Sequence, residues 1–370
     1  MNASIARAGG LGDRTWGRSW LVLATLIAGC NHAQPFQSPG PPQQGPRTSV
    51  PPIRLTYNLD QDLAPTWKPD GSGVLYIYGE SDRSDHDRCI GLLPARGGTR
   101  IASKCYPFDA AGDSTDVFEV VAAGPDGRIA WIEAHSAQGE PAPSGRELRV
   151  GTLPSADRGT VAMSFPFDSP SGQRLSVVTH LAWLGADLVF VGAEVAYSAA
   201  CTSCPVDTLV VGGEVDRVNL AASPPTLEVI PGTDSATSVW PTPDGAAIYY
   251  TVRGDSRVYR RDLVAGTITT IHDFTSAGIV RDVAAGDSTL TAVVGGKVSV
   301  VDTLSIGPVQ VDSGGFLHHL DLRTSKDSVL DIPGFLIRHP VLSPDGASIV
   351  AEVYPDLGSQ IADLWLFQTP

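Results

Sequence analysis

The stretch Trp67-Lys68-Pro69-Asp70-Gly71-Ser72-Gly73-Val74-Leu75-Tyr76-Ile77-Tyr78 decides the fold, because its tight turn and following apolar strand recur along the chain. In the turn, proline presets φ, aspartate can bond the backbone just ahead, and glycine supplies the positive φ that reverses the chain. Complete copies follow at Pro125-Asp126-Gly127, Pro243-Asp244-Gly245 and Pro344-Asp345-Gly346, and degenerate copies lie at 184–191 and 285–293. The chain therefore consists of six repeating units.

One unit shows what each repeat builds. Residues 238–240, 247–251, 257–262 and 267–271 predict four short antiparallel strands. The units lie roughly 43 to 60 residues apart, which is the period of propeller blades. A single four-stranded sheet cannot bury both of its faces, so each needs a neighbour on either side, and a ring of six provides that. We expect an all-β, six-bladed β-propeller over residues 53–370.

The repeats, with an aromatic residue before Pro-Asp-Gly and a strand after it, resemble those of the TolB-like, WD40-like propeller family. Four units match well and two poorly, and the resemblance covers about Pro65 to Phe367. It implies a cell-envelope protein that binds a protein or peptide partner through one face or through the mouth of its axial channel.

The last unit is one strand short. After 349–353 and 364–367 the chain ends, whereas Ile53-Arg54-Leu55-Thr56-Tyr57 precedes the first unit and alternates like a strand. Closure of the ring removes open sheet edges. We therefore expect this N-terminal strand to complete the last blade.

The N-terminus has the pattern of a bacterial lipoprotein. Arg7, Arg14 and Arg18 precede a short apolar run over 20–28, and Leu26-Ile27-Ala28-Gly29-Cys30 matches a lipoprotein signal. We expect residues 1–29 to be a signal peptide, Cys30 to be lipidated, and the Pro- and Gln-rich residues 30–52 to form a semi-extended tether. Lipid on Cys30 would anchor the protein to a membrane. Asn31 favours the outer membrane over the inner one.

The charge argues against nucleic acid as a partner. The whole chain has a formal net charge of −14, which becomes −16 without residues 1–29. Nucleic-acid binding needs a basic surface that neutralises phosphates. No dense stripe of Lys and Arg is present in the sequence, and we expect a monomer with an acidic surface.

Four cysteines remain after lipidation, in a compartment that permits disulfides. Cys89 begins a predicted third strand and Cys105 follows the fourth, so they can face each other across a hairpin. Cys201 and Cys204 form a Cys-x-x-Cys pair in an inserted loop. A local disulfide is the favoured interpretation of that pair, and redox activity or metal binding are the alternatives.

The sequence lacks the common catalytic motifs. The sequence contains no G-x-S-x-G, H-E-x-x-H or G-x-x-x-x-G-K-[ST] pattern, so it predicts no catalytic residue, metal or cofactor. If a site exists, it should lie on the propeller axis, where the innermost strands converge. His180, Arg281, Arg338 and His339 are placed there and suit a carboxylate or an acidic peptide. The alternative is that they only cap strands or bond neighbouring loops.

These observations favour a lipid-anchored, non-enzymatic propeller that binds an envelope protein or peptide. The alternative is a small-molecule-binding propeller, or a hydrolase or lyase, with its site in the axial channel, because fold alone does not decide function. A thiol redox protein would require Cys201 and Cys204 to be exposed and reactive.

Overall fold

The computed structural model describes residues 50–57, 60–79, 88–105, 114–137, 145–153, 158–171, 174–199, 206–296, 298–304, 307–312, 314–355 and 361–370. All of them belong to one compact unit, Pro41–Pro370. The signal peptide, Cys30, Cys201, Cys204 and most of the tether lie outside the described residues.

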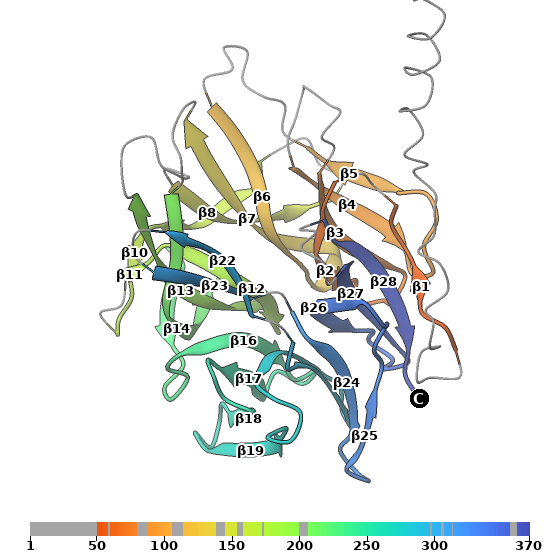
Figure 1. The fold of residues 1–370 in the computed structure, drawn as a ribbon. Helices are drawn as coiled ribbons and strands as arrows, with labels where there is room; N and C mark the ends of the chain where they lie inside the picture. The colour runs from red at the N-terminus through yellow and green to blue at the C-terminus, as the bar shows by residue number, and fades with distance from the viewer. Residues whose placement is uncertain are drawn as a thin grey trace, which may run out of the picture. The chain divides into compact units, whose positions relative to one another are not determined.

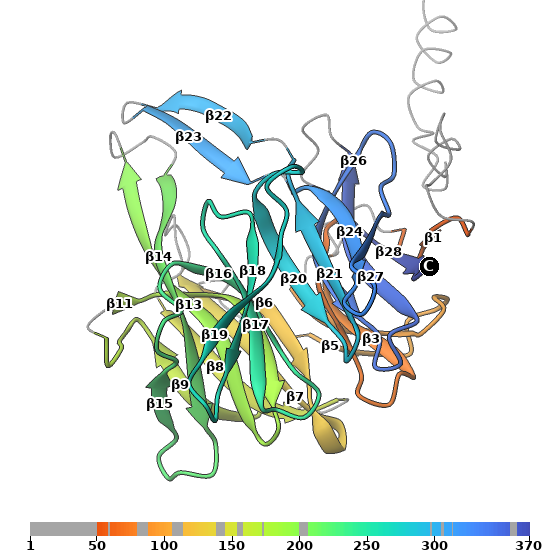
Figure 2. The same ribbon diagram turned by 90° about the horizontal axis from the view of Figure 1, so that it is seen from below.

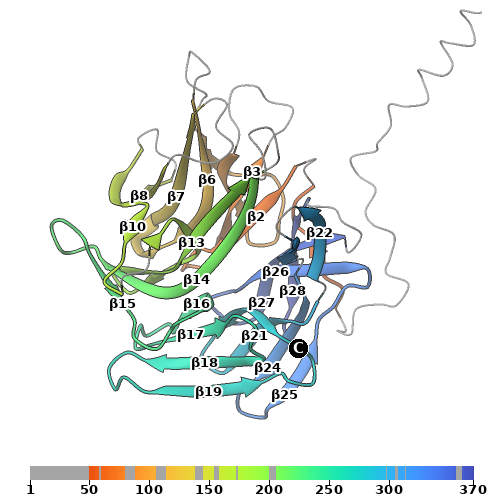
Figure 3. The same ribbon diagram turned by 60° about the vertical axis from the view of Figure 1, so that its left-hand side comes forward.

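Six four-stranded antiparallel sheets surround an axis (Figure 1), which confirms the predicted propeller. Seen from the side, the four strands of a blade run next to one another, as β16 to β19 do in Figure 3. Within each blade the strands are ordered from the axis outward. Blade 1 has β2 (Asp62–Trp67), β3 (Gly73–Gly79), β4 (Arg88–Pro94) and β5 (Ala102–Lys104); blade 2 has β6 (Ser114–Ala123), β7 (Arg128–Ala137), β8 (Gly145–Thr152) and β9 (Thr160–Phe165); blade 3 has β12 (Val177–Leu184), β13 (Asp187–Ala199), β14 (Val206–Asn219) and β15 (Thr226–Val229). Blade 4 has β16 (Ala236–Pro241), β17 (Ala247–Val252), β18 (Arg257–Asp262) and β19 (Ile268–Asp273); blade 5 has β20 (Val280–Ala285), β21 (Thr289–Val294), β24 (Phe316–Asp321) and β25 (Lys326–Val329); blade 6 has β26 (Phe335–Leu342), β27 (Ser348–Pro355), β28 (Asp363–Gln368) and β1 (Ile53–Arg54).

The hydrophobic core lies between the blades. Alternate residues of a strand point to opposite faces, so on β3 Val74, Tyr76 and Tyr78 pack toward blade 6, while Leu75 and Ile77 pack toward blade 2. An apolar cluster of this kind fills each of the six interfaces between neighbouring blades. This burial on both faces explains why the second strand of each unit reads as a continuous apolar run rather than an alternating one.

Three of the four Pro-Asp-Gly turns have the predicted chemistry, whereas in the turn at Pro125-Asp126-Gly127 the aspartate also has a positive φ, +57°. Gly71, Gly245 and Gly346 have φ near +70° (68°, 68° and 70°). The side chain of Asp244 accepts a hydrogen bond from the Ala246 N–H at 3.0 Å, and Asp345 does the same for Ala347 at 3.0 Å. Each turn therefore reverses the chain from the innermost strand to the second strand of its blade.

The N-terminal strand closes the ring, as expected. Ile53 pairs with Leu366 and Arg54 with Trp365 across β1 and β28. The Leu55 N–H continues the pairing by donating to the Leu364 carbonyl at 2.7 Å. On the axis, β26 contacts β2, so the innermost strands also form a closed circle.

We predict that Leu55→Ala lowers the free energy of unfolding by about 2 to 5 kcal/mol, because Leu55 is 4% exposed and packs between blades 6 and 1. Chemical denaturation measures this change. Ile53→Ala is the matched control, since Ile53 lies on the same strand but is 48% exposed, and its effect should stay within about 0.5 kcal/mol. Equal effects of the two variants would contradict the role assigned to this strand.

Two hairpins interrupt the repeat, and the sequence did not indicate them. The pair β10 (Phe167–Asp168) and β11 (Arg174–Leu175) lies between blades 2 and 3, and β22 (Val298–Leu304) and β23 (Gly307–Asp312) separate the second and third strands of blade 5. Figure 2 shows β22 and β23 projecting from the same side of the ring as the far ends of β13 and β14. Among the described residues, no helix has the length and hydropathy needed to cross a membrane.

Candidate functional site

A β-bulge in every innermost strand shapes the axis. The pairing of the first with the second strand shifts register once in each blade, between Leu63 and Thr66, Phe118 and Val120, Val178 and His180, Ala236 and Ser238, Val280 and Asp282, and Arg338 and Val341. A bulge bends its strand and redirects a side chain. In blades 3, 5 and 6, polar side chains at or beside the bulge face the axis.

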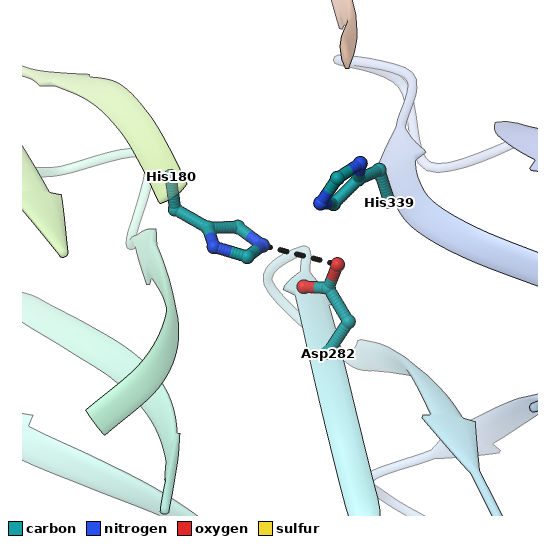
Figure 4. A group of neighbouring side chains, drawn as sticks. All are labelled: His180, Asp282 and His339. Carbon is teal, nitrogen blue, oxygen red and sulfur yellow. Dashed lines mark hydrogen bonds and ion pairs between the residues drawn. The ribbon is translucent and has the colours of Figure 1, made fainter. Parts of the chain in front are cut away.

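Three of these side chains meet at the centre. His180 on β12, Asp282 on β20 and His339 on β26 point toward one another (Figure 4). The distance from His180 Nε2 to Asp282 Oδ2 is 3.1 Å, and the two imidazole rings lie 5.1 Å apart, edge to face. His339 has φ +43°, a left-handed conformation that costs free energy for a residue with a side chain. We call this cluster the axial triad.

A buried carboxylate fixes the orientation of His339. Glu352 on β27 is 2% exposed, and its Oε1 lies 2.6 Å from His339 Nδ1. The same oxygen accepts the Ala64 N–H of blade 1 at 2.7 Å. Glu352 thus connects blades 1 and 6 on the inside of the ring and holds one nitrogen of the His339 ring, which leaves Nε2 for other partners.

The titration of these groups reflects their mutual charges. Burial by itself would raise the pKa of Asp282, but the neighbouring His180 and His339 hold that pKa below its ordinary value. Burial also disfavours a charged His339, yet Glu352 and Asp282 together raise the pKa of His339 to about 9. His339 in turn lowers the pKa of Glu352 against the effect of burial. At neutral pH, His339 is therefore an imidazolium held between two carboxylates.

The axial triad separates two compartments of one channel. The larger compartment, about 980 Å³, lies at the end of the ring with the Pro-Asp-Gly turns, and half-buried Trp183 and Trp240 line it. The smaller compartment, about 290 Å³, lies toward the opposite end, and Arg253, Arg281 and Arg338 line it. His180, Asp282 and His339 line both. A ligand in either compartment would therefore contact the triad.

The structure brings all four residues predicted for the axis to this channel: His180, Arg281, Arg338 and His339 line the smaller compartment. Arg281 Nε donates to the Gly295 carbonyl at 2.5 Å, which is a contact of the capping kind that the sequence left open. The Nε of Arg338 is buried without a hydrogen-bond partner in the described part of the chain, and its guanidinium lies over the Tyr354 ring, 4.9 Å from the ring centroid.

Asp282 and Glu352 were not predicted from the sequence. Asp282 directly follows Arg281, which was singled out, but the bulge that turns it to the axis depends on pairing with β21. Glu352 could have been identified from the sequence, because it is the one charged residue in the apolar run Ile349-Val350-Ala351-Glu352-Val353. A carboxylate buried inside a strand is costly unless it is paired.

A second cluster of titratable side chains, Asp116, Glu133 and His135, lies on blade 2. Arginines already neutralise it: Arg158 pairs with Asp116, and Arg149 Nε lies 3.2 Å from Glu133 Oε2. These ion pairs, together with His135, hold β6, β7 and β8 together. We therefore assign this cluster a role in stability. The axial triad differs from it because it lines a cavity.

The predicted hairpin disulfide is present. Cys89 and Cys105 are bonded, with their Cα atoms 4.5 Å apart, and join β4 to the end of β5. Cys30, Cys201 and Cys204 lie outside the described residues, so lipidation and the state of the Cys-x-x-Cys pair stay predictions.

Fold and site together define a six-bladed β-propeller with a polar cluster on its axis. No protein-family model matches the chain, and no curated protein matches it. One similar solved structure is a calcium-binding protein, regucalcin, from Agrobacterium tumefaciens, with TM-score 0.50 and 12% identity; the alignment covers 85% of this chain and 92% of regucalcin. Another is a gluconolactonase from Xanthomonas campestris, with TM-score 0.50 and 12% identity; the alignment covers 90% of this chain and 98% of the gluconolactonase. A TolB from Acinetobacter baumannii is also similar (TM-score 0.48, 16% identity), and the alignment covers 80% of this chain and 63% of the length of that TolB. At these identities the likeness establishes the fold alone, the one that the TolB-like repeats predicted.

The comparisons overturn the prediction that this protein is not an enzyme. That prediction followed from the absence of known catalytic motifs in the sequence. The similar structures include a gluconolactonase and a luciferin-regenerating enzyme, the latter with TM-score 0.50, 12% identity and coverage of 86% of this chain. The same fold thus carries enzymes, and the axial triad consists of residue types that do chemistry.

Proposed function

We propose that this protein binds, in its axial channel, a small molecule that carries a carboxylate or another compact anionic group. The observation that carries the proposal is the smaller compartment, where Arg253, Arg281 and Arg338 line one cavity beside the protonated His339. Arginine binds carboxylates with paired, charge-assisted hydrogen bonds. The larger compartment, with its tryptophans, would take the less polar remainder of the ligand.

The second candidate is the end of a peptide from an envelope partner, as the TolB-like repeats implied. The volume of the larger compartment, about 980 Å³, supports it, since a cavity of this size has room for an extended chain end. The terminal carboxylate would occupy the same arginine-lined compartment. We further propose, from the sequence alone, that lipid on Cys30 anchors the protein in the bacterial cell envelope. Loss of the protein from the membrane fraction on Cys30→Ser tests that proposal, and retention would contradict it.

We predict that Arg281→Met and Arg338→Met each weaken binding of the anionic ligand by about 10- to 100-fold, the contribution of one charge-assisted hydrogen bond. Thermal-shift measurements against mono- and dicarboxylic acids, sugar acids and inorganic phosphate identify the ligand, and calorimetry gives its affinity. Adding peptides with a free or an amidated C-terminus distinguishes the two candidates.

Arg257→Gln is the matched control. Arg257 lies on β18, away from the channel, and pairs with Asp255 at 2.7 Å. Its variant should bind like the wild type. Binding that survives both channel variants, or that the Arg257 variant loses equally, would overturn the proposed site.

A further inference from the structure

We propose that the axial triad is a binding site for one divalent transition-metal ion, with His180 Nε2, Asp282 Oδ2 and His339 Nε2 as its ligands. The inference deepens the proposed function, because it concerns the same channel and adds an ion at the junction of its two compartments. No metal site was predicted here from the sequence.

The ligand atoms of the three side chains converge on the axis. The three residues come from blades 3, 5 and 6, and each can direct one nitrogen or oxygen atom to a common point, with all such atoms within 4.8 Å of one another. Bonds of about 2.0 to 2.2 Å place neighbouring ligand atoms about 3 to 3.4 Å apart. The pair His180 Nε2 and Asp282 Oδ2, at 3.1 Å, already meets this spacing. The two pairs that involve His339 lie within 4.8 Å, so each needs to close by at most about 1 to 2 Å.

The atoms of His339 and Asp282 that do not face the centre already have hydrogen-bond partners. His339 Nδ1 donates to Glu352, so its Nε2 is the nitrogen available to an ion. Asp282 Oδ1 accepts the Val283 N–H at 2.7 Å, which leaves Oδ2 as the ligand atom. Metal-binding histidines usually donate their other N–H to a carboxylate or carbonyl in this way, which sets the tautomer and the ring orientation. Glu352 is thus a positioning residue.

The ligand set determines which ions suit the site and which coordination positions stay free. Two imidazoles and one carboxylate suit Zn²⁺, Co²⁺, Mn²⁺ or Fe²⁺, whereas Ca²⁺ and Mg²⁺ prefer oxygen ligands alone. An ion with three protein ligands keeps at least one position for water or ligand. Because the triad lines both compartments, that position opens to the channel. The bond from His339 Nδ1–H to Glu352 would stay in place when an ion binds at Nε2.

Metal titration of the purified mature protein tests the inference. Bound metal is first removed with a chelator, the thiols are alkylated so that Cys201 and Cys204 cannot bind, and Zn²⁺ and Co²⁺ are added. We expect one ion per chain, a visible Co²⁺ absorption band and a rise in melting temperature with Zn²⁺. His180→Ala should weaken binding at least 100-fold, and Glu352→Gln about 10- to 100-fold with the stoichiometry kept.

His272→Gln is the matched control, since His272 lies on β19, the outermost strand of blade 4. It should bind the ion like the wild type, and circular dichroism verifies that every variant is folded. No binding by the wild type, or equal binding by His180→Ala, would overturn the inference. Anion binding is measured separately, on the protein from which metal has been removed. If no metal binds, the proposed anion binding is unaffected; if no anion binds, the proposed metal site is unaffected.

Discussion

Asp216→Asn should make the protein more stable than the wild type at pH 8, by several kcal/mol, and should bring the two proteins close together near pH 4. Asp216 on β14 is 0% exposed, and neither of its carboxylate oxygens has a hydrogen-bond partner among the described residues. Burial, with the nearby charge of Glu214 as a second cause, raises the pKa of Asp216 to about 8. The carboxyl group is therefore neutral in the folded protein at pH 7.

The direction of the pH effect follows from proton linkage. In the unfolded chain Asp216 loses its proton near pH 3.8, whereas in the folded protein it keeps it until about pH 8. Between these values the folded state binds one proton more, so its stability falls as pH rises, by about 1.4 kcal/mol for each pH unit at most. The stability that comes from the proton on Asp216 is complete below the pKa of Asp216 in the unfolded chain, 3.8, and is lost by about pH 8. Asparagine has no such proton and removes this slope.

Urea unfolding of both proteins at several pH values between 4 and 9 measures the difference. All other titrating groups are common to the two proteins, so the difference isolates Asp216. Glu228→Gln is the control, because Glu228 is an exposed carboxylate on the adjacent strand β15 and should leave the slope unchanged. A constant difference between wild type and Asp216→Asn across this range would show that Asp216 is ionised in the folded state.

The blades could be predicted from the sequence because their signals are local. A Pro-Asp-Gly turn and the strand after it lie within about a dozen residues, and the turn residues act on their own backbone. Even the closing strand 53–57 was predictable, since the missing strand of the last unit left one place for it. The hairpin β22–β23 was not, because its place outside the blade depends on the pairing of β21 with β24, which is not a local property of the sequence.

The axial triad was only half predictable for a different reason. His180 and His339 were placed on the axis by counting along the repeats, and the structure has them there. Asp282 required knowledge of the bulge between Val280 and Asp282, and a bulge is a property of two paired strands rather than of one sequence segment. Glu352 lies on a second strand, β27, which the repeat pattern assigns entirely to the core.

Trp131→Ala should lower the free energy of unfolding by about 3 to 5 kcal/mol, the usual cost of deleting a buried aromatic side chain. Trp131 on β7 is 0% exposed and lies in the apolar cluster between blades 1 and 2. Its ring meets Phe118 edge to face at 6.4 Å, and its Nε1–H donates to Glu133 at 3.4 Å. Chemical denaturation measures the loss, and Phe316→Ala, at an aromatic residue 42% exposed, should cost far less.

A neighbouring glycine shows whether the tryptophan fills a slot built for it. A Cβ atom at Gly151 would lie 2.9 Å from Cη2 of Trp131, closer than side chains pack, so Gly151→Ala should destabilise the wild type by about 1 to 3 kcal/mol through overpacking. In the Trp131→Ala background the ring is gone, and the same change should cost little or even fill part of the cavity. A double-mutant cycle would then give a coupling free energy of about 1 kcal/mol or more. Additive effects would show that the glycine is needed for the backbone of β8 and not for the tryptophan, and that the interface between blades 1 and 2 tolerates side chains of other shapes.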